Sequence, residues 1–309
     1  MARPRSKLIN LSDTHYYHCI SRCVRQAYLC GKDKKTGKNY EHRRGWVENR
    51  LLLLADIFCI GLCAYAVMSN HTHVVLRVDK SRSQKLSDID VAVKWMRLFK
   101  GSILLQQFIN PHSRACMSKV ERDQVRSEIQ VYRGRLADVS WFMRCLNEYI
   151  ARKANKEDEC KGRFWEGRFT SQALLDEKAV LACMTYVDLN PVRAGLATSL
   201  ESSKHTSIRR RILALMKKGK LKSLMPFTAE HGSKKSEGIP FEIYTYIKLV
   251  EITGKIKRPD KPGFIKSPSL FEEWGISPSH WIALTSKFEV AYKGKIRGDN
   301  FCASMPKAS

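Results

Sequence analysis

The sequence has few acidic residues: 30 Asp and Glu stand against 55 Lys and Arg, which gives a formal charge of +25 at neutral pH. It also lacks the roughly 18 to 20 uninterrupted apolar residues of a membrane-spanning helix, because Asp56 breaks the longest apolar stretch, 51–66. The basic N-terminus leads into polar residues and not into the apolar region of a signal peptide. We therefore expect a cytoplasmic protein with no membrane contact and a polyanionic partner.

The sequence contains no C-x-x-C pair among its ten cysteines, and its two C-x3-C pairs lie between apolar neighbours. This favours reduced, mostly buried thiols, with a zinc-binding, cysteine-rich regulator as the alternative. A length of 309 residues with 43% hydrophobic and 28% charged side chains excludes a disordered polycation. It suits one enlarged domain, or a domain with an appendage.

The first half of the chain contains patterns typical of a small sheet. Aromatic and β-branched residues predict a strand over 15–22, and after a polar loop over 31–45 a leucine-rich run predicts a helix over 46–59. Two strand-like segments, 62–68 and 71–78, flank the turn Ser69-Asn70 and predict a hairpin. Residues 79–137 are polar and have no assignable fold beyond a short helix over 91–99, so we interpret them as an insertion.

The next segments alternate helix and strand. Ser140 is the expected N-cap of a helix over 141–155 whose apolar face carries Phe142, Cys145, Leu146, Tyr149 and Ile150. A strand follows over 168–175. Asp176 is then the expected N-cap of a helix that ends at Leu189, before Asn190-Pro191.

Beyond Gly195 the composition changes. The segment 202–229 contains eight Lys and Arg and no acid, including Arg209, Arg210 and Arg211. A solvated helix face is one interpretation. The uncompensated charge favours a polyanion contact.

His71 and His73 are the residues most suggestive of chemistry. Alternate residues of a strand point to the same side, so the two imidazoles share one face of the predicted hairpin and form half of a metal site. Incidental histidines would give the same pattern. His15 and His18 on the first strand are three residues apart, so at most one faces that site, and we expect both to be structural.

Three ordered motifs make the region 15–196 resemble the IS200-like, single-tyrosine (Y1) transposases, most specifically the REP-associated tyrosine transposases. They are the hairpin AYAVMSNHTHVVL at 64–76, the block GRFWEGRF at 162–169 and the block YVDLNPVRAG at 186–195. The resemblance implies a ferredoxin-like α+β fold, the HUH endonuclease domain, in residues 1–196, followed by a basic, DNA-binding extension over 197–309. It also implies cleavage and rejoining of single-stranded or hairpin DNA through a 5′-phosphotyrosine, with Mg²⁺ or Mn²⁺ on His71 and His73, and a possible homodimer.

The same resemblance suggests Tyr149 as the nucleophile, since the family's tyrosine follows the hairpin on a helix. The register departs by one residue, because Asn155 keeps the family's interval to Gly167 and an ungapped match puts Ile150 at the tyrosine position. Related enzymes take a third metal ligand, an amide or carboxylate, about one helical turn past the tyrosine. Lys153 stands there in this chain, and the substitutes are Glu148, Asn155 and Gln172.

The remaining expected DNA contacts are basic and aromatic: Arg163, Trp165, Arg168, Arg193, Arg209, Arg210 and Arg211. The 162–169 block has an alternative interpretation, in which Phe164 and Trp165 belong to the core and the arginines are solvated. The displaced tyrosine register and Lys153 also leave a second function open, that of a domesticated, non-catalytic relative that binds structured DNA or RNA.

Overall fold

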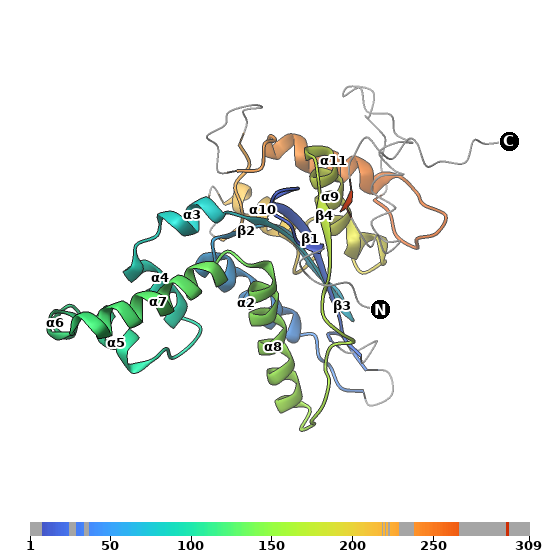
Figure 1. Ribbon diagram of the computed structural model, residues 1–309. Helices are drawn as coiled ribbons and strands as arrows, with labels where there is room; N and C mark the ends of the chain where they lie inside the picture. The colour runs from blue at the N-terminus through green and yellow to red at the C-terminus, as the bar shows by residue number, and fades with distance from the viewer. Residues whose placement is uncertain are drawn as a thin grey trace.

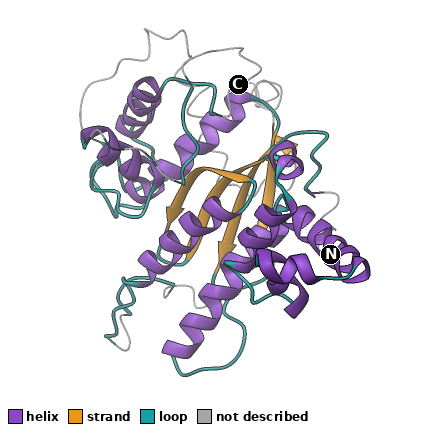
Figure 2. Ribbon diagram, turned by 90° about the vertical axis from the view of Figure 1, so that its left-hand side faces the viewer, coloured by secondary structure: helices purple, strands orange, loops and turns teal. Residues whose placement is uncertain are grey.

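The computed structural model describes residues 8–24, 29–33, 37–217, 219, 221, 223–228, 238–265 and 295–296. Four antiparallel strands form its centre, in the spatial order β2-β3-β1-β4: β1 (Tyr16–Arg22), β2 (Ile60–Val67), β3 (His71–Val78) and β4 (Thr170–Leu174). The short strand β5 (Lys295–Ile296) pairs in parallel with β4. Helices cover both faces of the sheet (Figures 1 and 2). The predicted α+β class is confirmed.

The connections follow the ferredoxin-like order. Helix α2 (Arg43–Ile57) joins β1 to β2, the β2–β3 hairpin follows, and α8 (Val139–Glu157) leads into β4. With β1 and β3 central, this is the β-α-β-β-α-β arrangement of that fold. The helices predicted at 46–59 and 141–155 and all four predicted strands are confirmed, with bounds that differ by a few residues.

The hairpin that carries the two histidines is buried on both faces. Every residue of β2 except Gly61 is buried, which explains its continuous apolar run. At the predicted turn, the Met68 N–H donates to the carbonyl of His71 (2.9 Å). This bond fixes where β3 begins, and His71 is its first residue.

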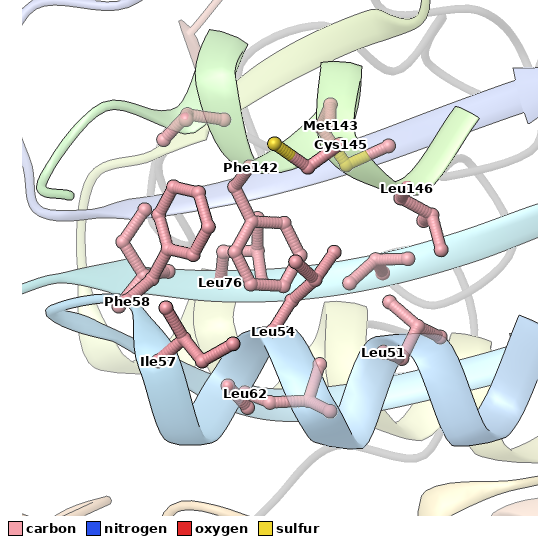
Figure 3. Close-up of a cluster of buried hydrophobic side chains, with 14 of the residues drawn as sticks. Leu51, Leu54, Ile57, Phe58, Leu62, Leu76, Phe142, Met143, Cys145 and Leu146 are labelled. Carbon is pink, nitrogen blue, oxygen red and sulfur yellow. The ribbon is translucent and has the colours of Figure 1, made fainter. Parts of the chain in front are cut away.

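The core between the sheet and its first helical layer holds α2 against α8 (Figure 3). Leu51, Leu54 and Phe58 meet Phe142 and Leu146, and the rings of Phe58 and Phe142 lie edge to face with centroids 5.3 Å apart. Strand residues Leu62 and Leu76 complete the cluster from the sheet. These apolar contacts fix α8 on this face.

Two predictions about α8 are wrong. Its N-cap is Asp138 and not Ser140, because the Asp138 carboxylate accepts the backbone N–H groups of Ser140 (2.5 Å) and Trp141 (3.1 Å). Tyr149 does not share the buried face: its side chain is 39% exposed, whereas Phe142, Leu146 and Ile150 are fully or almost fully buried.

The 79–137 segment is helical. It contains α3 (Lys80–Lys85), α4 (Asp88–Met96), α5 (Ile103–Ile109), α6 (Pro111–Cys116) and α7 (Lys119–Arg135), which project to one side of the sheet (Figure 1). Capping boxes begin α4 at Ser87 and α7 at Ser118. The Trp95 ring stacks on Tyr132, with centroids 4.4 Å apart, and so joins α4 to α7. The predicted helix at 91–99 corresponds to α4, which begins three residues earlier.

The second helical layer covers the other face of the sheet and consists of α9 (Glu177–Arg193), α10 (Ser207–Met216) and α11 (Ile243–Lys255). Asp176 caps α9 as predicted. The predicted end at Leu189 is wrong, since α9 continues through Pro191 to Arg193. Proline removes one backbone donor, and the burial of Leu189 and Val192 holds the last turn in place.

The region after Gly195 is part of the folded body where the structure describes it. Helix α10 packs on β2 and α11 packs on α9. The rest of the region after Gly195, including several lysines of the basic run, lies outside the described residues. In the described part of the chain no helix is long and apolar enough to cross a membrane. The described cysteines are thiols and most are buried, as predicted, and Cys302 lies outside the described residues.

Candidate active site

Three histidines gather on the sheet face that α9 covers. His71 and His73 lie on β3 with ring centroids 4.7 Å apart, and His18 on β1 stacks on His73 at 5.2 Å. Alternation along β3 identifies this face. Val75, two residues after His73 and therefore on the same side, belongs to the buried cluster around α9, while Val74 belongs to the cluster around α8. His15 precedes β1 and is exposed, so of the two histidines in this part of the chain it is His18 that faces the site.

A chain of hydrogen bonds fixes the orientation of these imidazoles. Gln172 Oε1 on β4 lies 2.9 Å from His18 Nδ1, and His18 Nε2 lies 3.0 Å from His73 Nδ1. An amide oxygen only accepts, so His18 Nδ1 carries the proton and its Nε2 accepts the proton of His73 Nδ1. His73 Nε2 is then a bare lone pair. It is buried and has no hydrogen-bond partner among the residues that the structure describes.

His71 is oriented in the same way by its neighbour. Its Nδ1 lies 2.6 Å from Asn70 Oδ1, so the proton sits on Nδ1 and Nε2 is left as the lone pair. Burial lowers the pKa of His18 and of His71 to about 4, and lowers that of His73 well below its usual range. All three are neutral at physiological pH, the form in which histidine binds metal ions.

Two residues of α9 complete the cluster. The Tyr186 ring lies perpendicular to that of His73, with centroids 5.3 Å apart, and 6.1 Å from that of His18. Asn190 lies one helical turn after Tyr186, on the same side of α9, and its buried Nδ2 has no hydrogen-bond partner in the described part of the chain. A half-turn of the amide exchanges its nitrogen and oxygen, so this position presents either a donor or a metal-binding oxygen.

The structure does not bring Tyr149 to the histidines. Helix α8 packs on the opposite face of the sheet, where its Asn147 donates to Ser21 of β1 (2.8 Å). Tyr149, two residues further along the helix, points away from the sheet and lies under the guanidinium of Arg50, 4.6 Å from the ring centre. Ile150, at the position of the ungapped family match, is fully buried.

The predicted third ligands have different surroundings. Glu148 pairs with Arg144 and Arg152 on the surface of α8, and the Asn155 amide donates to the carbonyl of Gly162 (2.9 Å). Gln172 is in the cluster, but its oxygen is bound to His18. Lys153 lies over the ring of Trp46, 4.1 Å from its centre.

The 162–169 block lies beside His71, the partly exposed member of the histidine cluster. Its backbone pairs with the end of β1, where Glu166 N–H donates to the carbonyl of Arg22 (2.9 Å), and Arg22 is the β1 partner of the partly exposed His71. Arg22, Arg163 and Arg168 are exposed. Phe164 is buried, and Trp165 is half-buried with its indole N–H bound to the carbonyl of Asn147 (2.8 Å).

The other predicted DNA contacts divide into buried and exposed arginines. Arg193 is buried and donates to the carbonyls of Thr253 and Ile256, each at 2.7 Å. Arg211 is 1% exposed and donates to the carbonyls of Cys63 and Met225. Arg209 and Arg210 are partly exposed on α10.

Sequence reasoning missed Tyr186, Asn190, His18 and Arg22 as members of this region. The signal for the first two was their four-residue spacing within the third motif, which places both on one side of a helix. Among the described residues no three His, Cys, Asp or Glu side chains form a complete metal site.

Comparisons with known proteins give one distant likeness. No protein-family model matches the chain, and no curated protein matches it. Among solved structures it is similar to a REP-associated tyrosine transposase bound to a REP hairpin, with 11% sequence identity and a TM-score of 0.40. The match covers 77% of this chain and 97% of the other.

Proposed function

We propose that this protein is a transposase-like enzyme that cuts and rejoins single-stranded DNA at hairpin or repeat ends, with Tyr186 as its nucleophile and His71 and His73 as ligands of Mg²⁺ or Mn²⁺. One observation carries the proposal: the fold brings a tyrosine of α9 to within 5.3 Å, ring to ring, of His73, and the Nε2 atoms of His73 and His71 are bare lone pairs. The formal charge of +25 supports DNA as the partner.

The chain's own residues account for the covalent step. The Tyr186 oxygen attacks the scissile phosphorus and loses its proton, the bond from phosphorus to the 3′ oxygen breaks, and that oxygen takes up a proton. The products are a 5′-phosphotyrosine and a free 3′-hydroxyl, so no energy source is needed for the reverse reaction. A divalent metal bound by the histidines would offset the charge that develops on the phosphate.

We propose Asn190 as the third metal ligand, in place of Glu148, Asn155 and Gln172. It is an amide one helical turn past Tyr186, and its buried nitrogen has no partner in the described part of the chain. Gln172 then acts as a positioning residue through His18. For the DNA contacts beside His71 we propose Arg22, Arg163, Trp165 and Arg168, and we leave out the buried Arg193 and Arg211.

The test is capture of the covalent adduct. Purified protein, a 3′-labelled single strand carrying a repeat hairpin, and Mn²⁺ should yield a labelled protein–DNA adduct that migrates with the protein on a denaturing gel, because the 5′-phosphotyrosine keeps the fragment on the 3′ side of the cut. Tyr186→Phe should abolish it. Tyr149→Phe, the matched control on α8, should leave it unchanged. An adduct that persists in Tyr186→Phe would overturn the assignment.

A second candidate is a non-catalytic relative that binds structured DNA or RNA, and the burial of the site favours it. Tyr186 is 9% exposed and His73 2%, so a scissile phosphate reaches them only if the site opens. This candidate predicts tight, salt-sensitive binding that EDTA does not change, and no adduct with any single strand. Metal-dependent nicking would exclude it.

A further inference from the structure

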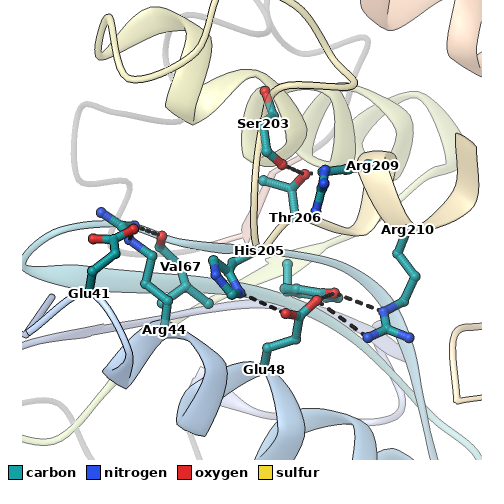
Figure 4. A network of polar contacts seen from close by, with 10 residues as sticks. Glu41, Arg44, Glu48, Val67, Ser203, His205, Thr206, Arg209 and Arg210 are labelled. Carbon is teal, nitrogen blue, oxygen red and sulfur yellow. Dashed lines mark hydrogen bonds and ion pairs between the residues drawn. The ribbon is translucent and has the colours of Figure 1, made fainter. Parts of the chain in front are cut away.

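A cleft separate from the histidine site lies between α2 and α10, near the β2 edge of the sheet, and Figure 4 shows two of its lining side chains, Glu48 and Arg210, in contact. Its volume is about 520 Å³, within the usual range of small-ligand sites. Residues from both helices and from the chain after α10 line it, chiefly Glu48, Arg209, Arg210, Leu213, Ala214 and Lys217.

The charges around this cleft are unbalanced. Its one carboxylate, Glu48, is already engaged by Tyr65 (2.5 Å), by His205 (2.7 Å) and by Arg210 (3.5 Å). Within the described residues the Arg209 guanidinium donates to the backbone carbonyl of Glu201 (2.8 Å), and neither Arg209 nor Lys217 pairs with an acid. Two cations are therefore left for an anionic ligand.

Part of the lining of the cleft is apolar. Leu213 and Ala214 on α10 and Leu221 beyond it line the cavity and are half-buried. Cations beside apolar side chains match the two parts of a nucleotide, because the phosphate binds to basic groups and the flat base packs against apolar side chains. Paired bases within a duplex do not present a free face, so this lining matches an unpaired nucleotide.

The cleft is joined rigidly to the histidine site. Thr206 bridges Ala66 of β2, and Ala66 pairs with His73 of β3, so two strand spacings, about 10 Å, separate the cleft's edge from the histidine. At this connection the backbone of His205 has a left-handed conformation, with φ 57°. Its carbonyl accepts a hydrogen bond from the N–H of Val67 (3.2 Å). Even at the compact duplex rise of 3.4 Å per nucleotide, three nucleotides span about 10 Å, so a single strand is long enough to reach both places.

We propose that this cleft binds one unpaired nucleotide of the single-stranded DNA on which the histidine and tyrosine site acts, with its phosphate on Arg209 and Lys217 and its base against Leu213 and Ala214. The choice of DNA rests on the proposed function. Of the three arginines expected from the sequence to contact DNA on α10, this proposal keeps Arg209, and it adds Lys217.

The first experiment measures binding of a fluorescein-labelled oligo(dT) 12-mer by fluorescence anisotropy. The double variant Arg209→Ala/Lys217→Ala should bind at least tenfold more weakly than the native protein. Arg126→Ala/Arg152→Ala removes the same charge from side chains that are 60% and 80% exposed elsewhere, and should weaken binding less than threefold. Equal losses in the two double variants would show a diffuse charge effect and overturn the cleft.

A second variant separates the base from the phosphate. Ala214→Phe fills the cleft without changing charge, and should weaken binding at least fivefold while the slope of log K against log salt stays the same. Arg209→Ala/Lys217→Ala should lower that slope by about 0.7 for each lost phosphate contact. Ala115→Phe, an equal enlargement at an exposed position of α6, is the control and should bind normally. Native-like binding by Ala214→Phe would overturn the nucleotide site.

The failure of this inference differs from the failure of the proposed function. If the cleft variants bind normally while the native protein forms the adduct, the cleft is wrong and the catalysis stands. If no adduct forms but the cleft variants lose binding, the reverse holds.

Discussion

His73 is the residue on which the candidate site depends. Its Nδ1 is held by His18, whose other nitrogen is held by Gln172, and its Nε2 is buried without a partner in the described residues. An unsatisfied buried polar atom costs about 1 to 3 kcal/mol. A bound ligand removes that cost, and a neutral imidazole held by such outer partners is a favourable metal ligand.

We expect Gln172→Leu to weaken Mn²⁺ binding about tenfold, because His18 then loses the acceptor that fixes its tautomer and with it the orientation of His73. Titration of the free Mn²⁺ signal by electron paramagnetic resonance measures this without any enzyme assay. Gln107→Leu, the same change at an exposed site of α5, is the control and should not alter affinity. Unchanged Mn²⁺ affinity in Gln172→Leu would contradict the positioning role.

Helix α8 shows why a helical pattern locates a face but not its edge. Phe142, Leu146 and Ile150 are buried against the sheet and α2, while Tyr149, adjacent to Ile150 in the sequence, is turned toward Arg50. Residues one position apart differ by about 100° around a helix. Tyr149 lies just outside the apolar face, a difference that the sequence spacing did not resolve.

The two aromatic residues of α8 should differ sharply in their effect on stability. Phe142→Ala opens a cavity against Phe58 and should lower the free energy of unfolding by about 3 to 5 kcal/mol. Tyr149→Ala removes a partly exposed ring and one cation–π contact, and should lower it by about 1 kcal/mol or less. Urea unfolding of the two variants compares them directly. A loss for Tyr149→Ala as large as that for Phe142→Ala would mean that Tyr149 is a core residue.

The molecule as a whole is held together by contacts that cross the predicted boundary near Gly195. Asp188 of α9 accepts hydrogen bonds from Ser207 of α10 (2.5 Å) and from Tyr246 of α11 (2.7 Å). Both helices also bury apolar side chains against α9. Deleting 202–309 would expose this core, so point variants in the α10 cleft are the better test of DNA binding.

Asp188 should make stability depend on pH. Burial raises its pKa from 3.8 to about 6, so between these values the folded state holds a proton that the unfolded state has lost. This contribution to the free energy of unfolding is complete below about pH 4, falls as the pH rises to 6, and is then lost. At about 1.4 kcal/mol per pKa unit, its full size is about 3 kcal/mol.

Asp188→Asn removes the titration and leaves an amide able to form similar hydrogen bonds. Relative to the native protein, the variant should therefore gain about 3 kcal/mol between pH 4 and pH 7, as measured by urea unfolding at each pH. A difference between the two proteins that does not change with pH would show that Asp188 does not titrate in this range. The comparison cancels the other titrating groups, which both proteins share.

The sequence by itself determined the α+β class, the hairpin with its paired histidines and the positions of the main helices. These depend on local periodicity and turn chemistry, which adjacent residues carry. Only the tertiary structure decided which side chains share the site. His18, Gln172 and Tyr186 come from separate strands and a helix far along the chain, and the order of the strands and the packing of α9 on one face bring them to His73. Spacing along the chain does not encode which face of a sheet a distant helix covers, so Tyr149 and Tyr186 could be told apart only in the folded protein.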